Sequence, residues 1–338
     1  MTYHSKAYHE AHGQQGFSLI ELMIGLVLGM FVIGVIVTVF VQSKHNFNQD
    51  EQIAQMQENG RYALQLLSRE VSHAGFLGGM SAVDTITLDS NTTVFSTSTN
   101  TCAEWFNPLA KPIEIYDEGT TEASCFGLGE APGTRVLVVK RTDGKPTAVP
   151  AANKLYFRTP GQGGTIIQTT SAGSTPAGRV DWEYFVEVYY IKNDDSDGDG
   201  TSVPGLHRQR LVVTGGAINL TDDGLLVPGI RNFDLLYGID TGEDDGIADE
   251  YEVSTSYGGT MNKVVSARVS VLAASVFKDH NYENNKQYTL YPSVVAPAYI
   301  TGLSDAANGS NYYGRVFSTT AQIRNNAYRI QIYSIAKQ

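Results

Sequence analysis

The chain has 338 residues, of which 42% are hydrophobic and 17% are charged, and its formal net charge is −11. This length suits one large domain or two ordinary ones, and the composition is that of a folded protein. Abundant Gly, Ser, Thr, Asn and Tyr favour strands joined by polar turns on an extracytoplasmic surface. An acidic chain without a cluster of Lys and Arg argues against nucleic acid as the partner.

A long apolar run lies near the N-terminus, behind a polar segment. Residues 1–16 are polar, whereas Thr38 is the only polar residue between Leu22 and Val41. About 20 apolar residues in a helix span a hydrocarbon layer of about 30 Å. The sequence QSKHNFNQDEQ that follows has no small-residue cleavage pattern, so we expect the run to stay attached to the chain.

The order G-F-S-L-I-E, from Gly16 to Glu21, stands directly before this run. It resembles the class III signal of type IV pilins and pseudopilins. The resemblance implies that a prepilin peptidase cuts after Gly16, removes residues 1–16 as a leader and methylates the new N-terminal Phe17. It also implies that Glu21 pairs in the filament with the N-terminal amine of a neighbouring subunit or of its own chain. The alternative is a plain signal anchor in which Glu21 is incidental.

Helical periodicity continues beyond the apolar run. We predict one helix from Phe17 to about residue 74, with residues 17–41 in the membrane or filament core and residues 42–79 as an amphipathic periplasmic half. Glycines at 75, 78 and 79 end the pattern. A separate second helix after a break near residues 43–49 is the alternative. The apolar stripe of the second half comprises Ile53, Met56, Gly60, Ala63, Leu64, Leu67, Val71 and Ala74.

Residues 80–338 carry the pattern of a β-rich domain. Candidate strands occur at 83–88, 135–141, 154–159, 182–192, 208–214, 231–239, 262–274 and 328–335. Several alternate apolar and polar residues, as half-buried antiparallel strands do. No helical period separates them, which disfavours a doubly wound α/β fold. We therefore expect an α+β protein, in which a long N-terminal helix packs on an antiparallel sheet with loop insertions, as in the pilin fold.

Three blocks narrow the resemblance: residues 58–79, 225–240 and 313–325 are similar to PilW-type minor pilins. This resemblance implies a single-pass inner-membrane protein with a periplasmic C-terminal domain, which later joins the pilus at the cell surface. Its implied partners are other minor pilins, major pilins and the prepilin peptidase, and presentation of a tip adhesin stays open. A J-type pseudopilin of a type II secretion system is one alternative. A signal-anchored periplasmic calcium-binding adhesin or enzyme is the other.

Two cysteines, Cys102 and Cys125, lie outside the apolar run. An even, low count in an exported chain predicts one disulfide, and the alternative is two unpaired thiols. The chain-entropy estimate for a loop of this size is roughly 3 kcal/mol.

Two acidic loops suggest a hard-cation site. Asp195, Asp197 and Asp199 precede Gly200 in a D-x-D-x-D-G order that resembles the first half of a Ca²⁺ loop, but Leu206 stands where a bidentate Glu is needed. The weaker loop has Thr241, a poor ligand, at its first position and acids at Glu243, Asp245, Asp249 and Glu252. A solvated acidic turn is the alternative for both loops.

Catalytic motifs do not stand out. The sequence contains no G-x-S-x-G, H-E-x-x-H or Walker A pattern. Only His207 and His280 fall in the β-rich domain, and we expect both at its surface. We therefore predict a structural protein that requires no cofactor, with Ca²⁺ binding left open.

Overall fold

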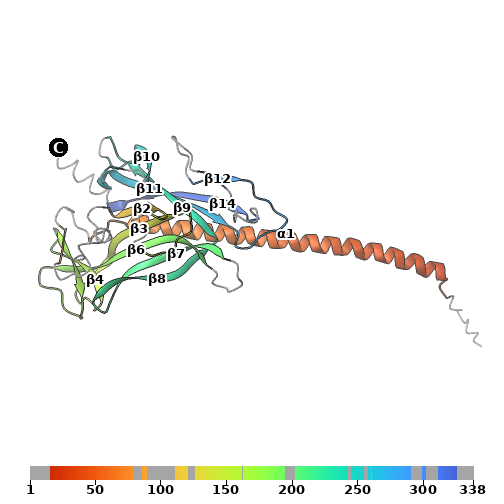
Figure 1. The fold of residues 1–338 in the computed structure, drawn as a ribbon, viewed down its shortest axis with the longest axis horizontal. Helices are drawn as coiled ribbons and strands as arrows, with labels where there is room; N and C mark the ends of the chain where they lie inside the picture. Colours follow the sequence, from red (N-terminus) through yellow and green to blue (C-terminus); the bar gives the residue numbers. More distant parts are fainter. Residues whose placement is uncertain are drawn as a thin grey trace, which may run out of the picture. The chain divides into compact units, whose positions relative to one another are not determined.

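The computed structural model describes residues 16–78, 86–89, 111–120, 126–161, 163–194, 202–242, 245–254, 258–259, 261–290, 299–301 and 311–325. One helix, α1, runs without a break over Leu19–His73 and confirms the predicted continuous helix (Figure 1). The alternative with a break near residues 43–49 is wrong. The chain divides into two compact units, Met1–Glu51 and Gln52–Gln338.

Glycines end α1 as the sequence predicted. Gly75 and Gly78 both adopt positive φ angles, 73° and 64°, which residues with a side chain rarely do. The N–H of Gly75 donates to the carbonyl oxygen of Lys140 at 2.9 Å, which ties the helix end to a strand. A Cβ on Gly78 would lie 2.5–2.8 Å from the indole of Trp182, so the chain passes this ring only because the residue is glycine.

Eight of the described strands form one sheet, here called sheet A. Its main order is β1-β5-β4-β6-β3-β2, and β7 pairs with both β6 and β8. All neighbours are antiparallel except β1 and β5. The strands are β1 (Ile86–Leu88), β2 (Ile113–Asp117), β3 (Arg135–Thr147), β4 (Lys154–Thr159), β5 (Gly164–Thr169), β6 (Val180–Asp194), β7 (Val203–Thr214) and β8 (Ala217–Pro228).

Sheet B contains four antiparallel strands in the order β10-β9-β11-β14. They are β9 (Ile230–Ile239), β10 (Glu250–Val253), β11 (Val264–Ala274) and β14 (Gly314–Gln322). The 3₁₀ turn η3 (Met261–Lys263) leads into β11, and β12 (Gln287–Thr289) pairs with β13 (Tyr299–Thr301) as a separate ribbon. Thus the predicted antiparallel β structure is confirmed, but the described strands divide between two main sheets.

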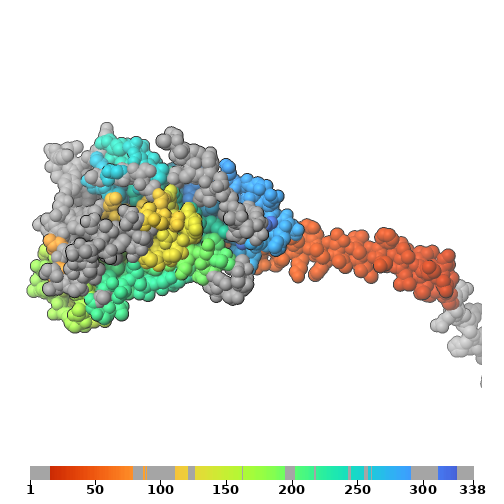
Figure 2. All heavy atoms as spheres, in the orientation of Figure 1, coloured from red at the N-terminus to blue at the C-terminus, as the bar shows by residue number. Residues whose placement is uncertain are grey.

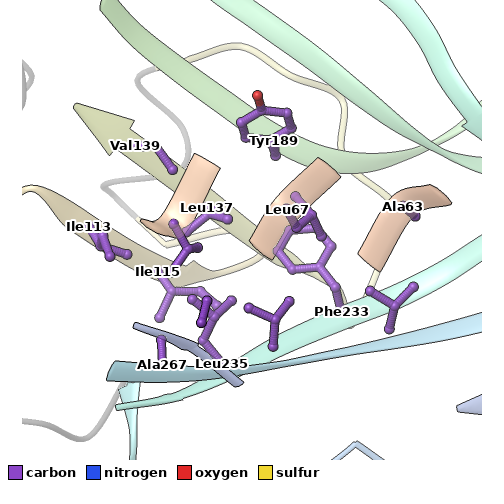
Figure 3. Close-up of a cluster of buried hydrophobic side chains, with 14 of the residues drawn as sticks. Ala63, Leu67, Ile113, Ile115, Leu137, Val139, Tyr189, Phe233, Leu235 and Ala267 are labelled. Atoms are coloured by element: carbon purple, nitrogen blue, oxygen red, sulfur yellow. The ribbon is translucent and has the colours of Figure 1, made fainter. Parts of the chain in front are cut away.

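The second half of α1 lies between sheets A and B (Figure 1). Its predicted apolar stripe is buried at Met56, Gly60, Ala63, Leu67 and Val71. Figure 3 shows Ala63 and Leu67 facing side chains from both sheets in one continuous core. The other labelled side chains of this core are Ile113, Ile115, Leu137, Val139, Tyr189, Phe233, Leu235 and Ala267.

The outer faces of both sheets are covered as well. Phe157, Tyr184 and Val186 belong to a second core on sheet A, and Leu236 and Leu272 belong to a third on sheet B. Because both faces of sheet B are covered, β9 and β11 are buried along almost their whole length, and their burial shows no simple alternation.

Seven of the eight predicted strands overlap observed strands, and the segments 83–85 and 328–335 lie outside the described residues. The predicted strands did not include β2, β5, β8, β10, β12, β13 or β14. Of these, β8 and β14 are rich in polar residues and lack a clear apolar face. Strand β14 has the sequence GRVFSTTAQ and lies at the edge of sheet B, with mostly exposed or half-buried side chains.

Helix α1 approaches sheet B closely at Gly60. A Cβ there would overlap the ring of Phe317 in β14 and lie 3.1 Å from the Cβ of Ala273 in β11. Gly60 is therefore required by packing, although glycine inside a helix lowers helix stability relative to alanine.

Gly60→Ala should destabilise the protein by about 1–3 kcal/mol because the added methyl group overpacks this contact. The measurement is thermal unfolding of the full chain in detergent, followed by circular dichroism. Gly25→Ala is the matched control, because a Cβ at Gly25 meets nothing within 4 Å. Equal unfolding temperatures for the wild-type protein and Gly60→Ala would contradict the packing argument.

Candidate functional site

The start of α1 is built by Ser18, a residue that the sequence analysis did not single out. Gly16, Phe17 and Ser18 precede the helix, and the Ser18 Oγ accepts the backbone N–H of Glu21 at 3.2 Å. Ser18 is thus an N-cap. Glu21 occupies the third helical position, where its negative charge interacts favourably with the positive end of the helix dipole. The S-x-x-E spacing of a capping box was a readable signal for this helix start.

Residues 17–41 present apolar side chains that the chain leaves exposed. Phe17 is 83% exposed, and the large hydrophobic residues from Leu19 to Val41 are each at least 53% exposed. Figure 2 shows this segment, in red and orange, as a continuous bare surface. The helix is long and apolar enough to cross a membrane. Such a surface requires lipid or other apolar helices around it.

Glu21 shares one face of α1 with two glycines. Gly25 and Gly29 follow it at intervals of four residues, and a hollow on this face is lined by Phe17, Glu21, Gly25 and Gly29, together with Leu22 and other apolar residues. A Cβ at either glycine would meet no atom within 4 Å. Small residues spaced in this way allow another helix to approach closely in an apolar medium. Within the described residues, Glu21 has no ion-pair partner.

The other end of α1 carries a buried charge cluster. Glu70 is only 2% exposed, and its Oε2 accepts a hydrogen bond from the Arg141 Nε at 2.9 Å. Arg141 also donates from Nη2 to the Glu187 Oε2 of β6 at 3.3 Å, and Arg69 donates to the Glu70 Oε1 at 2.9 Å. These bonds connect α1 to β3 and β6 and hold the helix at one axial position in the domain. The sequence analysis did not identify Glu70 as buried.

The two carboxylates of this cluster respond differently to their surroundings. Burial by itself raises the pKa of Glu70, but the charges of Arg141 and Arg69 outweigh burial, so the pKa is lowered. Burial raises the pKa of Glu187, and the nearby Glu70 raises it further against the charges of Arg141 and Arg208. The cluster therefore favours an ionised Glu70 and disfavours an ionised Glu187.

The predicted acidic loops are only partly within the described structure. Asp195, Asp197, Asp199 and Glu243 lie outside the described residues. Asp245 accepts the N–H of Ile247, Asp249 accepts the N–H groups of Thr241 and Gly242, and Glu252 is exposed in β10. In the described ranges no three acidic, His or Cys side chains lie close enough to hold a metal ion. Ca²⁺ binding at both loops stays a prediction.

The remaining candidate residues form no catalytic arrangement in the described part of the chain. His207 is 2% exposed in β7, so its expected surface position is wrong, and burial lowers its pKa although Asp194 lies 3.7 Å away. His280 is exposed, as expected. Cys102 and Cys125 lie outside the described residues, and their disulfide stays a prediction.

Two known protein families match this chain, one in the β-rich domain and one at the N-terminal junction. Residues 188–325 match the model of the family described as Type IV Pilus-assembly protein W, and residues 11–37 match the prokaryotic N-terminal methylation motif. No curated protein and no solved structure matches the chain. The first match covers the end of β6 and all of β7–β14, and the second covers the junction at Gly16 and Glu21. Both matches indicate a structural rather than a catalytic protein.

Glu70→Gln should destabilise the protein at pH 7 by about 1.5–3 kcal/mol, the usual contribution of hydrogen bonds to a charged group. A lowered pKa means that Glu70 contributes stability above its usual value of 4.5, and that this contribution is lost as the pH falls through the lowered pKa. The difference from the wild-type protein should thus shrink in acid. Urea unfolding of the full chain at several pH values measures it.

Glu187→Gln is the matched comparison. Its raised pKa means that the ionised carboxylate is disfavoured in the folded state, so the substitution should cost much less than Glu70→Gln at pH 7. Equal losses for the two variants at neutral pH would contradict this assignment.

Proposed function

The chain is a type IV pilin-like protein, and from this premise we propose that it is a minor pilin that primes the assembly of a type IV pilus. Residues 17–41 hold it in the inner membrane, with the C-terminal domain in the periplasm. A prepilin peptidase cuts after Gly16 and methylates Phe17, and the mature protein then joins other minor and major pilins. It has no enzymatic activity of its own.

The observation that carries the proposal is the bare apolar surface of residues 17–41, directly behind the junction that matches the methylation motif. A membrane anchor alone needs an apolar helix but does not need Glu21 near its end, where a carboxylate is costly. Cleavage after Gly16 creates a positive amine at Phe17. Glu21 can pair with such an amine on a neighbouring subunit, and the glycines beside it leave space for that subunit's helix.

We place the protein at or near the pilus tip. The described part of the domain already contains two sheets and three apolar cores, and bulky domains crowd a helical lattice of repeated subunits. A cap has no subunit above it and accommodates this bulk. Regularly spaced labelling along the pilus shaft would contradict this position.

A minor pseudopilin of a type II secretion system is a second candidate, because it would use the same N-terminal junction and the same helix. The neighbouring genes distinguish these two systems. A periplasmic protein that is only anchored by its signal is the third candidate, and it predicts no dependence on a prepilin peptidase.

The mature N-terminus decides between the pilin-like function and the anchored protein. Mass spectrometry of the protein purified from membranes should identify an N-terminal, methylated Phe17. In a strain without the prepilin peptidase, the same chain should keep residues 1–16. An identical N-terminus in both strains would refute processing and, with it, the proposed function.

Glu21→Ala should leave membrane insertion and cleavage intact and reduce the number of pili at the cell surface. A desolvated charge pair mainly penalises wrong registers, so the variant loses the contact that selects the axial position of the subunit. Cell fractionation measures insertion, and electron microscopy counts pili. Ser18→Ala is a control, because it removes the helix cap but keeps the carboxylate. Normal piliation by Glu21→Ala would contradict the role of Glu21.

A further inference from the structure

The loop that joins β9 to β10 contains a buried carboxylate, Asp240. The N–H of Asp249 donates to the Ile239 carbonyl oxygen at 2.9 Å and closes the loop. The N–H of Asp240 donates to the Lys263 carbonyl oxygen at 2.9 Å and ties the start of the loop to η3. Asp240 is 0% exposed. Its Oδ2 accepts the N–H of Gly246 at 2.8 Å, so the carboxylate points into the loop.

The second oxygen of this carboxylate, Oδ1, is buried and has no hydrogen-bond partner. Among the described residues, no Lys, Arg or His forms an ion pair with Asp240. A buried carboxylate oxygen without a partner is costly, and native proteins usually satisfy such groups with a donor, a water molecule or a cation. The described part of the fold therefore supplies no positive charge to balance the carboxylate of Asp240.

Two further aspartates border the same loop, and each uses one oxygen to shape it. The Asp245 Oδ1 accepts the N–H of Ile247 at 2.8 Å, and the Asp249 Oδ2 accepts the N–H of Gly242 at 2.8 Å. The other oxygen of each carboxylate has no hydrogen-bond partner among the described residues. Gly246 has a φ angle of 79°, a left-handed conformation that glycine adopts readily and that permits a sharp turn in this loop.

The structure changes which residue stands first in this loop. Counting along the sequence placed Thr241 there, a poor ligand, and weakened the case for a cation. In the fold, the preceding residue, Asp240, turns its carboxylate inward. We propose that the β9–β10 loop binds Ca²⁺, with the Asp240 Oδ1 as the buried ligand and with Asp245 and Asp249 supplying further oxygens.

Calcium fits this loop better than other metal ions. The segment 240–252 contains no His or Cys, so nitrogen and sulfur ligands for transition metals are absent from its sequence. Ca²⁺ accepts six to eight oxygens in a flexible geometry, including main-chain carbonyl oxygens and water. This tolerance allows the ion to complete its shell although three carboxylates do not already converge in the described structure. Mg²⁺ demands a near-ideal octahedron and dehydrates reluctantly.

The experiment compares the full chain in detergent after removal of metal with EDTA. CaCl₂ should bind with a dissociation constant of about 10⁻⁴–10⁻³ M, the range of extracellular modules, and should raise the unfolding temperature. Isothermal titration calorimetry and circular dichroism measure the two effects. Asp240→Asn keeps the shape of the side chain and its bond from Gly246, but it should weaken Ca²⁺ binding at least about tenfold. In EDTA this variant should unfold at the wild-type temperature or above it.

Three further variants make the result specific. Asp143→Asn changes an exposed aspartate that likewise accepts a neighbouring N–H, from Gly144 at 2.7 Å, and should leave Ca²⁺ binding unchanged. Asp197→Asn tests the other acidic loop, and Asp245→Asn tests the proposed site through an exposed residue if Asp240→Asn does not fold. The proposal is overturned if the wild-type chain binds no CaCl₂, if Asp240→Asn and Asp245→Asn titrate like the wild-type chain, or if only Asp197→Asn abolishes binding.

Discussion

The packing of α1 between two sheets is the constraint on which the rest of the domain depends. Sheets A and B each bury one face against the helix, and both then need a cover for the opposite face. The helix can come this close to sheet B only because Gly60 has no side chain where Phe317 lies. A glycine that weakens the isolated helix thus allows a close contact between the helix and sheet B.

A charge cluster complements this apolar contact by selecting one position of the helix. Apolar packing is non-directional and tolerates small sliding, whereas the bonds of Arg141 to Glu70 and Glu187 require particular atoms to meet. Because the cluster lies at the end of α1, next to the glycines that stop the helix, it defines where the helix ends in the domain. The apolar first half of the same helix is continuous with this anchored half.

Glu21 and Asp240 are opposite cases of a carboxylate that lacks a charged partner in the described chain. Glu21 is exposed on an apolar helix and would lose its water only in lipid or in a filament, so a charged group from another chain suits it. Asp240 is already without water inside its own loop, so a small cation suits it. The same kind of side chain, a carboxylate, thus suits an assembly contact at Glu21 and an ion-binding site at Asp240, because the two carboxylates differ in burial.

The sequence by itself determined the elements whose signals are local. The unbroken helix and its buried stripe from Met56 to Val71 follow from composition and from the 3.6-residue period of a helix, which need no knowledge of distant contacts. The junction at Gly16 and Phe17 is likewise a local signal, but it rests on the resemblance of a short motif to the class III signal. Half of the described strands were also predicted, from apolar runs and from alternation of apolar and polar residues, which are local signals as well.

The tertiary structure decided everything that depends on what lies opposite a residue. The division of the strands into two sheets, the polar edge strand β14, the buried Glu70 and the inward turn of Asp240 have no local signature. From the sequence alone, Glu70 would be placed on the solvent-facing side of the helix. Only the fold brings Arg141 of β3, about 70 residues away along the chain, into contact with it. Likewise, the sequence shows Asp240 only as a residue at the end of a strand. Its burial becomes visible only in the fold, because burial depends on contacts between residues that are distant in the sequence.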